Sequence, residues 1–161
     1  MKSRIVSFLG FTVMILGLFS CSSDDNSSDK GNNNLVGKWN ETEQLALDAK
    51  GKVLETLVEN NGVCPLNSAE YVAGGVIKNN FYNYSEVASN CEASVQDGTW
   101  KVEGNKLKLG LENEGINVEA VFTISEMSDK LLLLDRPMSR DDAEFFPPNT
   151  VTIRNVFRKV K

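Results

Sequence analysis

The chain has 161 residues, with 17 lysines and arginines, 22 aspartates and glutamates and no histidine, which gives a net charge of −5 at pH 7. This acidic balance leaves no basic surface for nucleic acid or anionic headgroups, so we expect neither as a direct partner. The lack of histidine removes the commonest general base and the commonest transition-metal ligand, so we expect no cofactor and no metal.

The first twenty residues have the pattern of a removable export signal. Lys2 and Arg4 precede an apolar run over residues 5–19. A membrane-spanning helix needs about 20 apolar residues, and this shorter run fits the core of a signal peptide. An uncleaved membrane anchor is the alternative. The residues after the run argue against it, because 22–25 are Ser-Ser-Asp-Asp rather than a cationic flank.

The signal ends in Leu18-Phe19-Ser20-Cys21. This segment resembles the lipobox of bacterial lipoproteins, in which the signal is cut before the cysteine and the cysteine is acylated. The resemblance implies a signal peptide over 1–20, a mature protein that starts at lipidated Cys21, and fatty acyl chains such as palmitate. Two or more chains are needed for stable anchoring, because one chain binds a membrane only marginally. We therefore expect an outer membrane lipoprotein of the cell envelope.

Residues 21–34 are predicted to form a disordered tether, because none of them after Cys21 can pack in a core. Asp24 and Asp25 resemble the export tag of surface lipoproteins in some Gram-negative bacteria, which implies exposure at the cell surface. The alternative is a solvated tether on the periplasmic side. Without Lys2 and Arg4, the 17 cationic residues fall to 15 against 22 acidic ones, so the mature chain carries −7.

Cys64 and Cys91 are the two cysteines that remain after Cys21 is acylated. One pair in an exported domain predicts a disulfide. A zinc or redox pair is the alternative, and it fits poorly because neither histidine nor a Cys-x-x-Cys spacing is present.

From Leu35 onwards, short segments with alternating apolar and polar residues are separated by turn residues, which is typical of an all-β domain. One short helix is predicted over 139–145, because Ser139 and Asp142 are close to a capping box. A clean apolar face on each strand favours an antiparallel barrel or sandwich. The nine predicted strands span 35–47, 52–59, 69–74, 76–86, 98–103, 106–112, 117–126, 130–135 and 151–160.

Gly37-Lys38-Trp39 opens the first predicted strand, and Gly98-Thr99-Trp100 stands near the middle of the domain. These motifs, ahead of a meander of antiparallel strands, resemble the lipocalin-like domains of bacterial lipoproteins. The resemblance implies an antiparallel up-and-down β-barrel of eight or nine strands over residues 35–161. It also implies that Trp39 packs across the closed barrel end beneath a cation from the last strand, Arg154 or Arg158. Plain core packing is the alternative role of Trp39.

Two functions remain open at this stage. The first is a barrel that binds a small apolar ligand, and the second is a filled barrel that acts as a protein- or glycan-interaction module at the cell surface. Aromatic residues fall on both faces of the segment Phe81–Tyr84, so one set packs in the core, lines a cavity or meets a partner. The candidate ligand-lining residues are Leu107, Leu109, Phe122, Ile124, Ile153 and Phe157.

No pattern in the sequence indicates catalysis. Without histidine, serine hydrolysis would need a lysine base, and no Ser-x-x-Lys motif on a helix is present. Acidic pairs such as Glu41 with Glu43 and Glu112 with Glu114 fit solvated strand faces. We therefore expect a protein that is not an enzyme. The sequence carries no signal for an oligomeric state.

Overall fold

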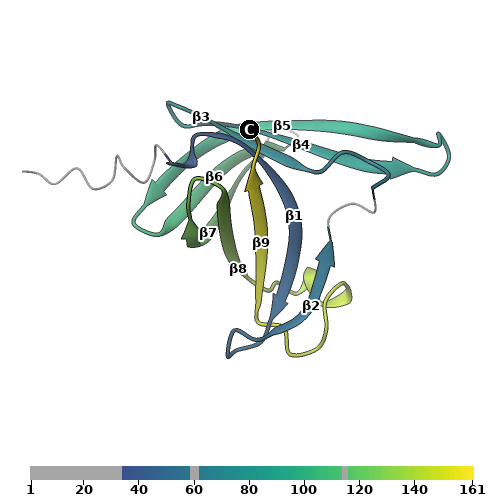
Figure 1. Cartoon of the computed structure of the whole chain (residues 1–161), viewed down its shortest axis with the longest axis vertical. Helices are drawn as coiled ribbons and strands as arrows, with labels where there is room; N and C mark the ends of the chain where they lie inside the picture. The colour runs from purple at the N-terminus through teal and green to yellow at the C-terminus, as the bar shows by residue number, and fades with distance from the viewer. Residues whose placement is uncertain (1–33, 59–61, 114–115) are drawn as a thin grey trace, which may run out of the picture.

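The computed structural model describes residues 34–58, 62–113 and 116–161, so the predicted signal peptide and Cys21 lie outside the described residues. The nine predicted strands are confirmed (Figure 1). The strands are β1 (Gly37–Leu47), β2 (Val53–Val58), β3 (Ser68–Val72), β4 (Val76–Ser85), β5 (Asn90–Glu103), β6 (Lys106–Asn113), β7 (Ile116–Met127), β8 (Leu131–Pro137) and β9 (Thr152–Lys159).

Eight of these strands close into an antiparallel barrel in the order β1-β3-β4-β5-β6-β7-β8-β9, and β9 pairs back onto β1. The remaining strand, β2, shares one edge of β1 with β3. β2 pairs with Glu43–Leu47, and β3 pairs with Gly37–Asn40. The prediction of an antiparallel barrel with a meander connectivity is therefore confirmed, and the sandwich is excluded.

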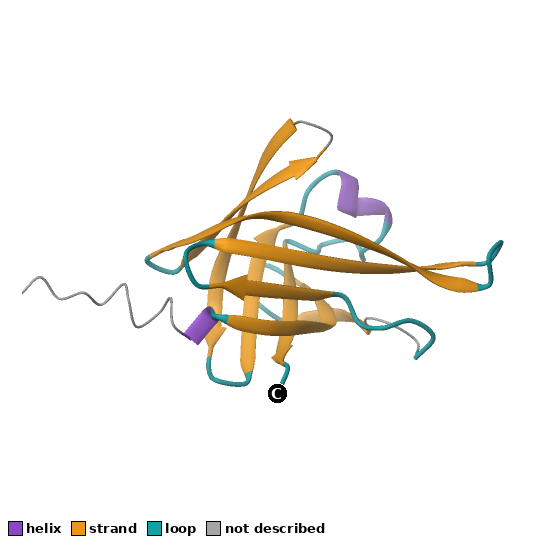
Figure 2. Ribbon diagram, turned by 90° about the horizontal axis from the view of Figure 1, so that it is seen from above, coloured by secondary structure: helices purple, strands orange, loops and turns teal. Residues whose placement is uncertain are grey.

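The hairpin of β4 and β5 extends beyond the barrel as a long arm (Figure 2). Its outer part pairs Phe81–Ser85 with Asn90–Ser94, and neither segment pairs with another strand. The predicted strand began only at Gly98, eight residues too late. Residues 90–97 alternate weakly apolar Cys91, Ala93 and Val95 with polar residues, but Ala93 and Val95 are exposed, so this part of the strand is held by pairing with β4 rather than by burial.

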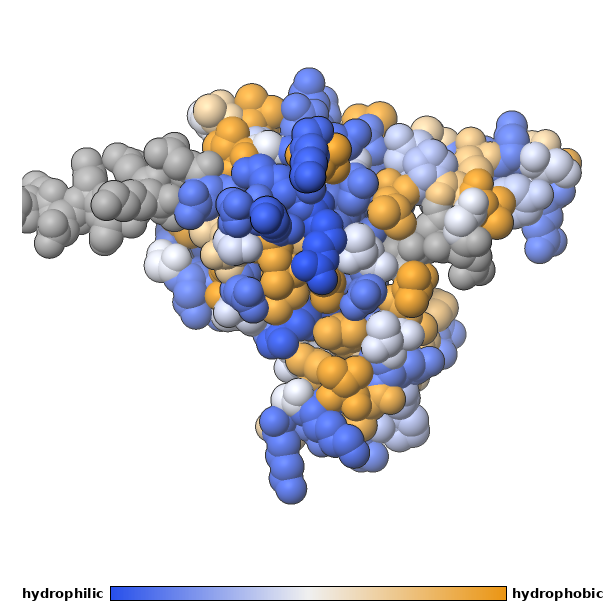
Figure 3. Space-filling model, viewed as in Figure 1, coloured by the Kyte–Doolittle hydropathy of each residue, from blue (hydrophilic) through white to orange (hydrophobic). Residues whose placement is uncertain are grey.

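Buried side chains form two clusters inside the barrel. The larger cluster fills one end, where Leu35, Trp39 and Leu107 are almost inaccessible to solvent. The smaller cluster lies at the other end, where Phe146 packs against Ala46 and Ile153. On the face drawn in Figure 3, hydrophilic side chains are mixed with hydrophobic ones, and the hydrophobic ones gather towards the lower part of the view. At the end of the smaller cluster, Val53 and Leu54 are exposed.

The helix predicted before the last strand is present as a short 3₁₀ helix, η1 (Asp141–Glu144). Its start is fixed by the Asp142 carboxylate, which accepts hydrogen bonds from the backbone N–H and the hydroxyl of Ser139, both at 2.7 Å. Arg136 also binds this carboxylate through both terminal nitrogens, at 2.6 and 2.8 Å. Ser139 and Asp142 therefore join the residue before the N-cap to the second residue of the helix, whereas the N-cap residue Arg140 makes no side-chain capping hydrogen bond.

Both Gly-x-Trp motifs mark places where a side chain does not fit. Gly37 has a φ of 127°, and a Cβ there would lie 2.8 Å from Cε of Lys159. Gly98 lies against β6, where a Cβ would come within 2.4 Å of the Gly110 carbonyl oxygen. Glycine at these positions lets the chain turn into the barrel and lets two strands approach closely.

The predicted disulfide joins Cys64 and Cys91, with the two Cα atoms 5.6 Å apart. It joins the segment between β2 and β3 to the start of β5. All nine strands, both buried clusters and this disulfide lie within residues 34–161.

Candidate ligand cavity

A cavity of about 150 Å³ lies inside the barrel, and its wall comes from seven of the strands that close it. Strict alternation along β6 and β7 points every second side chain inwards, which gives one apolar side of the cavity. The apolar lining residues are Ala69, Tyr71, Phe81, Leu109, Leu111, Ala120, Phe122, Leu134 and Phe157.

The opposite side of the cavity is polar. It is made by Glu41, Asn67, Ser68, Asn79 and Asn155, from β1, the β2–β3 segment, β3, β4 and β9. Glu41, Ser68 and Asn79 are all buried, with at most 8% of each residue exposed. The cavity is thus amphipathic, because one wall is hydrocarbon and the other carries amide, hydroxyl and carboxylate groups.

Glu41 points inwards because it lies two residues after buried Trp39 on β1, and a β-bulge then brings Gln44 to the same inner face. The pairing of β1 with β9 shifts between Glu41 and Glu43, so Thr42 is the extra residue. Glu41 lies opposite inward-facing Phe157, and Gln44 lies opposite Asn155. Gln44 Nε2 donates a hydrogen bond of 3.2 Å to Glu41 Oε1. The bulge therefore gathers three polar side chains at the seam between the first and last strands.

Asn155 contributes an unused acceptor to this seam. Its Oδ1 is buried, and it has no hydrogen-bond partner among the described residues. A buried acceptor without a partner costs about 1–3 kcal/mol relative to a bonded one. This atom therefore favours a guest that brings a donor.

Glu41 also affects the electrostatics of the apolar wall. Burial raises the pKa of the Tyr71 phenol well above its usual range, and the Glu41 charge raises this pKa further. Tyr71 therefore stays protonated at physiological pH and adds no second negative charge to the cavity.

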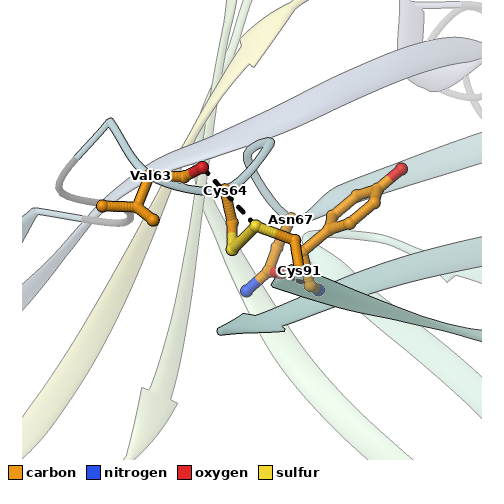
Figure 4. The surroundings of a disulfide bond; sticks show 5 residues. Val63, Cys64, Asn67 and Cys91 are labelled. Atoms are coloured by element: carbon orange, nitrogen blue, oxygen red, sulfur yellow. Dashed lines mark hydrogen bonds between the residues drawn. A yellow bond between two sulfur atoms is a disulfide. The ribbon is translucent and has the colours of Figure 1, made fainter. Parts of the chain in front are cut away.

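The mouth of the cavity lies where the sheet divides between β2 and β4. The backbone carbonyl of Asn67 accepts a hydrogen bond from Glu41 N–H, and its Oδ1 accepts one from Tyr82 N–H, both at 2.9 Å. Asn67 and the disulfide lie in the same segment (Figure 4), where Cys91 Sγ sits 3.4 Å from the Val63 carbonyl oxygen. Phe81 lines the cavity and is 38% exposed, so it marks the opening.

The opposite end of the barrel is closed by Trp39. Its Nε1 donates a 2.7 Å hydrogen bond to the Leu35 carbonyl oxygen, and the side chain is fully buried. The cation over its ring is Lys159, with Nζ 5.0 Å from the ring centroid. A second tryptophan, Trp100, packs nearby and donates to the Val72 carbonyl oxygen at 3.0 Å.

The expectation that Arg154 or Arg158 covers Trp39 is corrected by the strand register. Trp39 lies directly opposite Lys159, whereas Arg158 lies opposite Asn40 and therefore points to the other face. Arg154 lies further along β9 and binds Asp135 through two hydrogen bonds of 2.7 and 2.8 Å.

The six candidate lining residues divide into two groups. Leu109, Phe122 and Phe157 line the cavity. Leu107 and Ile124 belong to the larger buried cluster at the closed end, and Ile153 belongs to the smaller one. The expectation that Glu41 lies on a solvated face is wrong, because Glu41 shares the inner face of β1 with buried Trp39, two residues before it. Asn155 was visible in the sequence as a polar residue on an otherwise apolar strand face.

A family model described as a lipocalin-like domain matches residues 35–133. The chain belongs to the lipocalin-like domain family. Lipocalin-like domains often bind small apolar ligands, and the family is generally non-catalytic. No curated protein matches the chain.

Two solved structures are similar to this lipocalin-like barrel at low sequence identity. One is a lipocalin-like protein from Bacteroides uniformis, with 14% identity and a TM-score of 0.48; the match covers 79% of this chain and 99% of that one. The other is an uncharacterized protein from Bacteroides eggerthii, with 15% identity and a TM-score of 0.46, covering 78% and 99%.

Within the described ranges, no three acidic, cysteine or histidine residues gather where they could hold a metal ion. Among the same residues, no helix has the length and apolar character to cross a membrane.

Proposed function

We propose that this protein is a lipid-anchored, non-catalytic lipocalin-like protein of the bacterial cell envelope that binds a small ligand inside its barrel. The observation that carries the proposal is the cavity of about 150 Å³ with its wall of leucine, alanine and aromatic side chains. An apolar protein cavity of about 150 Å³ is large enough for benzene. The cavity favours ligand binding over the alternative of a filled barrel that acts through its outer surface.

The side chains around the cavity support a binding role rather than a catalytic one. Ser68 is the serine of its lining, and its Oγ is 3.4 Å from Asn80 Nδ2, an amide that cannot serve as a general base. Nucleophilic catalysis by serine needs a base within hydrogen-bond reach.

The anchor is proposed from the sequence of residues 18–21, which resembles a lipobox. Replacement of Cys21 by alanine is expected to leave the barrel folded and to release it from the membrane. Membrane fractionation with and without this change measures the effect. Stable, lipid-dependent retention of Cys21→Ala would exclude acylation at Cys21 as the anchor.

Native mass spectrometry tests the binding function directly. The protein is purified from the membranes of the source bacterium, the tether is cut, and residues 34–161 are sprayed under native and denaturing conditions. We expect a stoichiometric adduct of low mass that is lost on denaturation. A bare mass, together with no uptake of toluene, would support the filled-barrel alternative and overturn the proposal.

A further inference from the structure

We propose that the ligand of this cavity is a small neutral hydroxyl compound, a phenol or alcohol with a body about the size of a benzene ring, and that its hydroxyl group donates a hydrogen bond to Asn155. This inference rests on the proposed function, because it assigns a chemical class to a ligand of the same cavity. The polar atom that supports it is Asn155 Oδ1, and the apolar residues beside this atom set the size of the ligand.

The position of Asn155 on β9 places it on the cavity wall. It lies two residues before Phe157, and both residues line the cavity, because side chains two apart on a strand share a face. Asn155 Oδ1 is buried and has no hydrogen-bond partner among the described residues. A ligand in the cavity therefore lies beside an acceptor that the barrel leaves unused.

The residues on either side of Asn155 in the sheet explain why this acceptor is unused. Asn155 lies opposite Gln44 of β1 and opposite Leu134 of β8. Leu134 is hydrocarbon and carries no side-chain donor. Gln44 Nε2 donates its hydrogen bond to Glu41 Oε1, at 3.2 Å. Within the described part of the chain, neither neighbour donates to Asn155 Oδ1, so a ligand in the cavity is the remaining source of a donor.

A single unused acceptor selects a ligand with a donor. A hydroxyl group brings one O–H donor, whereas a hydrocarbon brings none and a carboxylate brings only acceptors. An acceptor that is kept from water without a hydrogen bond is costly. A ligand that supplies the donor is therefore favoured over a ligand of the same size that does not.

The same acceptor favours a neutral donor over a cationic one. Asn155 Oδ1 belongs to an uncharged amide, so it offers an ammonium group no opposite charge. A charge that leaves water for such a partner costs more than a hydroxyl group that does so. Glu41 takes no part in this hydrogen bond.

The apolar wall sets the body of the ligand. Leu109, Phe122 and Phe157 present hydrocarbon and aromatic surface to a space of about 150 Å³, which is enough for a benzene ring. Because Phe157 and Asn155 lie next to each other on the inner face of β9, a ring that packs against Phe157 brings a hydroxyl group on that ring close to the amide.

The experiment compares phenol, toluene and benzylamine. Phenol and toluene have the same shape and differ in one group, hydroxyl or methyl. In a cavity without an unused acceptor, phenol would bind more weakly than toluene, because its hydroxyl group would lose a hydrogen bond to water. Each probe is titrated by calorimetry into the full-length Cys21→Ala protein, which keeps the whole barrel.

We expect phenol to bind at least as tightly as toluene and at least tenfold more tightly than benzylamine. Weaker binding of phenol than of toluene would overturn the assignment of a hydroxyl group and would leave the apolar binding function standing. Binding of benzylamine within tenfold of phenol would overturn the assignment of a neutral donor. Failure of all three probes to bind would overturn both the assignment and the binding function.

One substitution locates the hydroxyl group, and a matched substitution serves as the control. Asn155→Leu removes the unpartnered acceptor, so binding of phenol relative to toluene should fall at least tenfold, the scale of one hydrogen bond. Asn40→Leu makes the same change on the outer face of β1, beside Trp39, and should leave this ratio intact. If leucine at position 155 also abolishes toluene binding, the smaller Asn155→Ala variant carries the same test. An unchanged ratio in a position-155 variant that still binds toluene would place the hydroxyl group elsewhere and overturn the proposal.

Discussion

Lys159 is the residue that covers the closed end of the barrel, where its ammonium group lies over the ring of fully buried Trp39. Replacement by methionine keeps the length of the side chain and removes the charge. We expect Lys159→Met to lower the free energy of unfolding by about 1 kcal/mol, the usual scale of a partly buried cation–π contact. Urea denaturation measures the change.

The matched control for this change is Arg158→Met on the neighbouring position of β9. Arg158 is exposed and lies opposite Asn40, so its loss should alter stability by less than about 0.5 kcal/mol. If Arg158→Met lowered the free energy of unfolding more than Lys159→Met, the assignment of Lys159 as the cation over Trp39 would be wrong.

Asp142 is a second residue whose charge stabilises the fold. The hydrogen bonds from Arg136, with those from Ser139, hold the pKa of this carboxyl far below its ordinary value of 3.8. A carboxyl with a lowered pKa in the folded state stabilises the protein above its unfolded pKa, and this contribution is lost as pH falls through the folded pKa.

We therefore expect Asp142→Asn to lower stability by about 2 kcal/mol at pH 7, as for a lost charge-assisted pair. The difference from the unmodified protein should shrink as pH falls below about 4, because protonation removes the same charge. Urea denaturation at pH 7, 5, 3 and 2 measures it, with Asp141→Asn as the neighbouring control. A difference that stays constant from pH 7 to pH 2 would show that the carboxylate charge is not responsible.

At the scale of elements, the contact between β5 and β6 sets how closely the barrel wall can curve. Alanine at position 98 would place a Cβ 2.4 Å from a backbone oxygen of Gly110, and the backbone would have to move. Alanine at position 110 would meet only the Thr99 hydroxyl, at 2.7 Å, and that side chain can rotate. We expect Gly98→Ala to cost about 1–3 kcal/mol, as in other overpacked sites, and Gly110→Ala to cost clearly less. Thermal denaturation of the two variants compares them, and equal losses would contradict the steric account.

The elements that alternation could predict are those with one buried face. β6 and β7 were assigned correctly with their inward residues, because Leu107, Leu109 and Phe122 alternate with polar residues. The start of β5 is not predicted although Cys91, Ala93 and Val95 alternate with polar residues, because this alternation is short and only weakly apolar and the segment is held by pairing with β4. β2 and β3 were predicted as two separate strands on either side of the disulfide loop. The sequence did not predict that both strands would pair with β1.

The candidate site was less predictable than the fold, for a specific physical reason. Glu41 follows the alternation from Trp39, but one extra residue, Thr42, reverses the alternation beyond it and brings Gln44 to the same inner face. Bulges are set by the pairing partner as much as by the bulged strand itself, so residues 37–47 alone do not reveal this one. Asn155 was placed on the correct face, and its significance depends on the partners it lacks, which only coordinates can show.

At the scale of the whole molecule, the cavity lies between two filled ends. Trp39 and its neighbours close one end, and Phe146 with Ala46 and Ile153 fills part of the other. The two buried clusters therefore stabilise the barrel without side chains that fill the cavity between them. Its cavity is a place where stability has not been maximised, as is common at binding sites.

Ala120 offers a way to exchange binding for stability, because it is the smallest side chain of the apolar β7 wall that lines the cavity. Ala120→Leu should fill part of the cavity, raise the free energy of unfolding by about 1 kcal/mol and abolish uptake of toluene. Val121→Leu adds one methylene on the outer face of the same strand, where Val121 is 43% exposed, and should change neither quantity. Urea denaturation and calorimetric titration of both variants test this. The three carbon atoms that leucine adds would occupy much of a cavity of about 150 Å³. Undiminished binding of toluene by a folded Ala120→Leu variant would therefore mean that toluene binds outside the barrel.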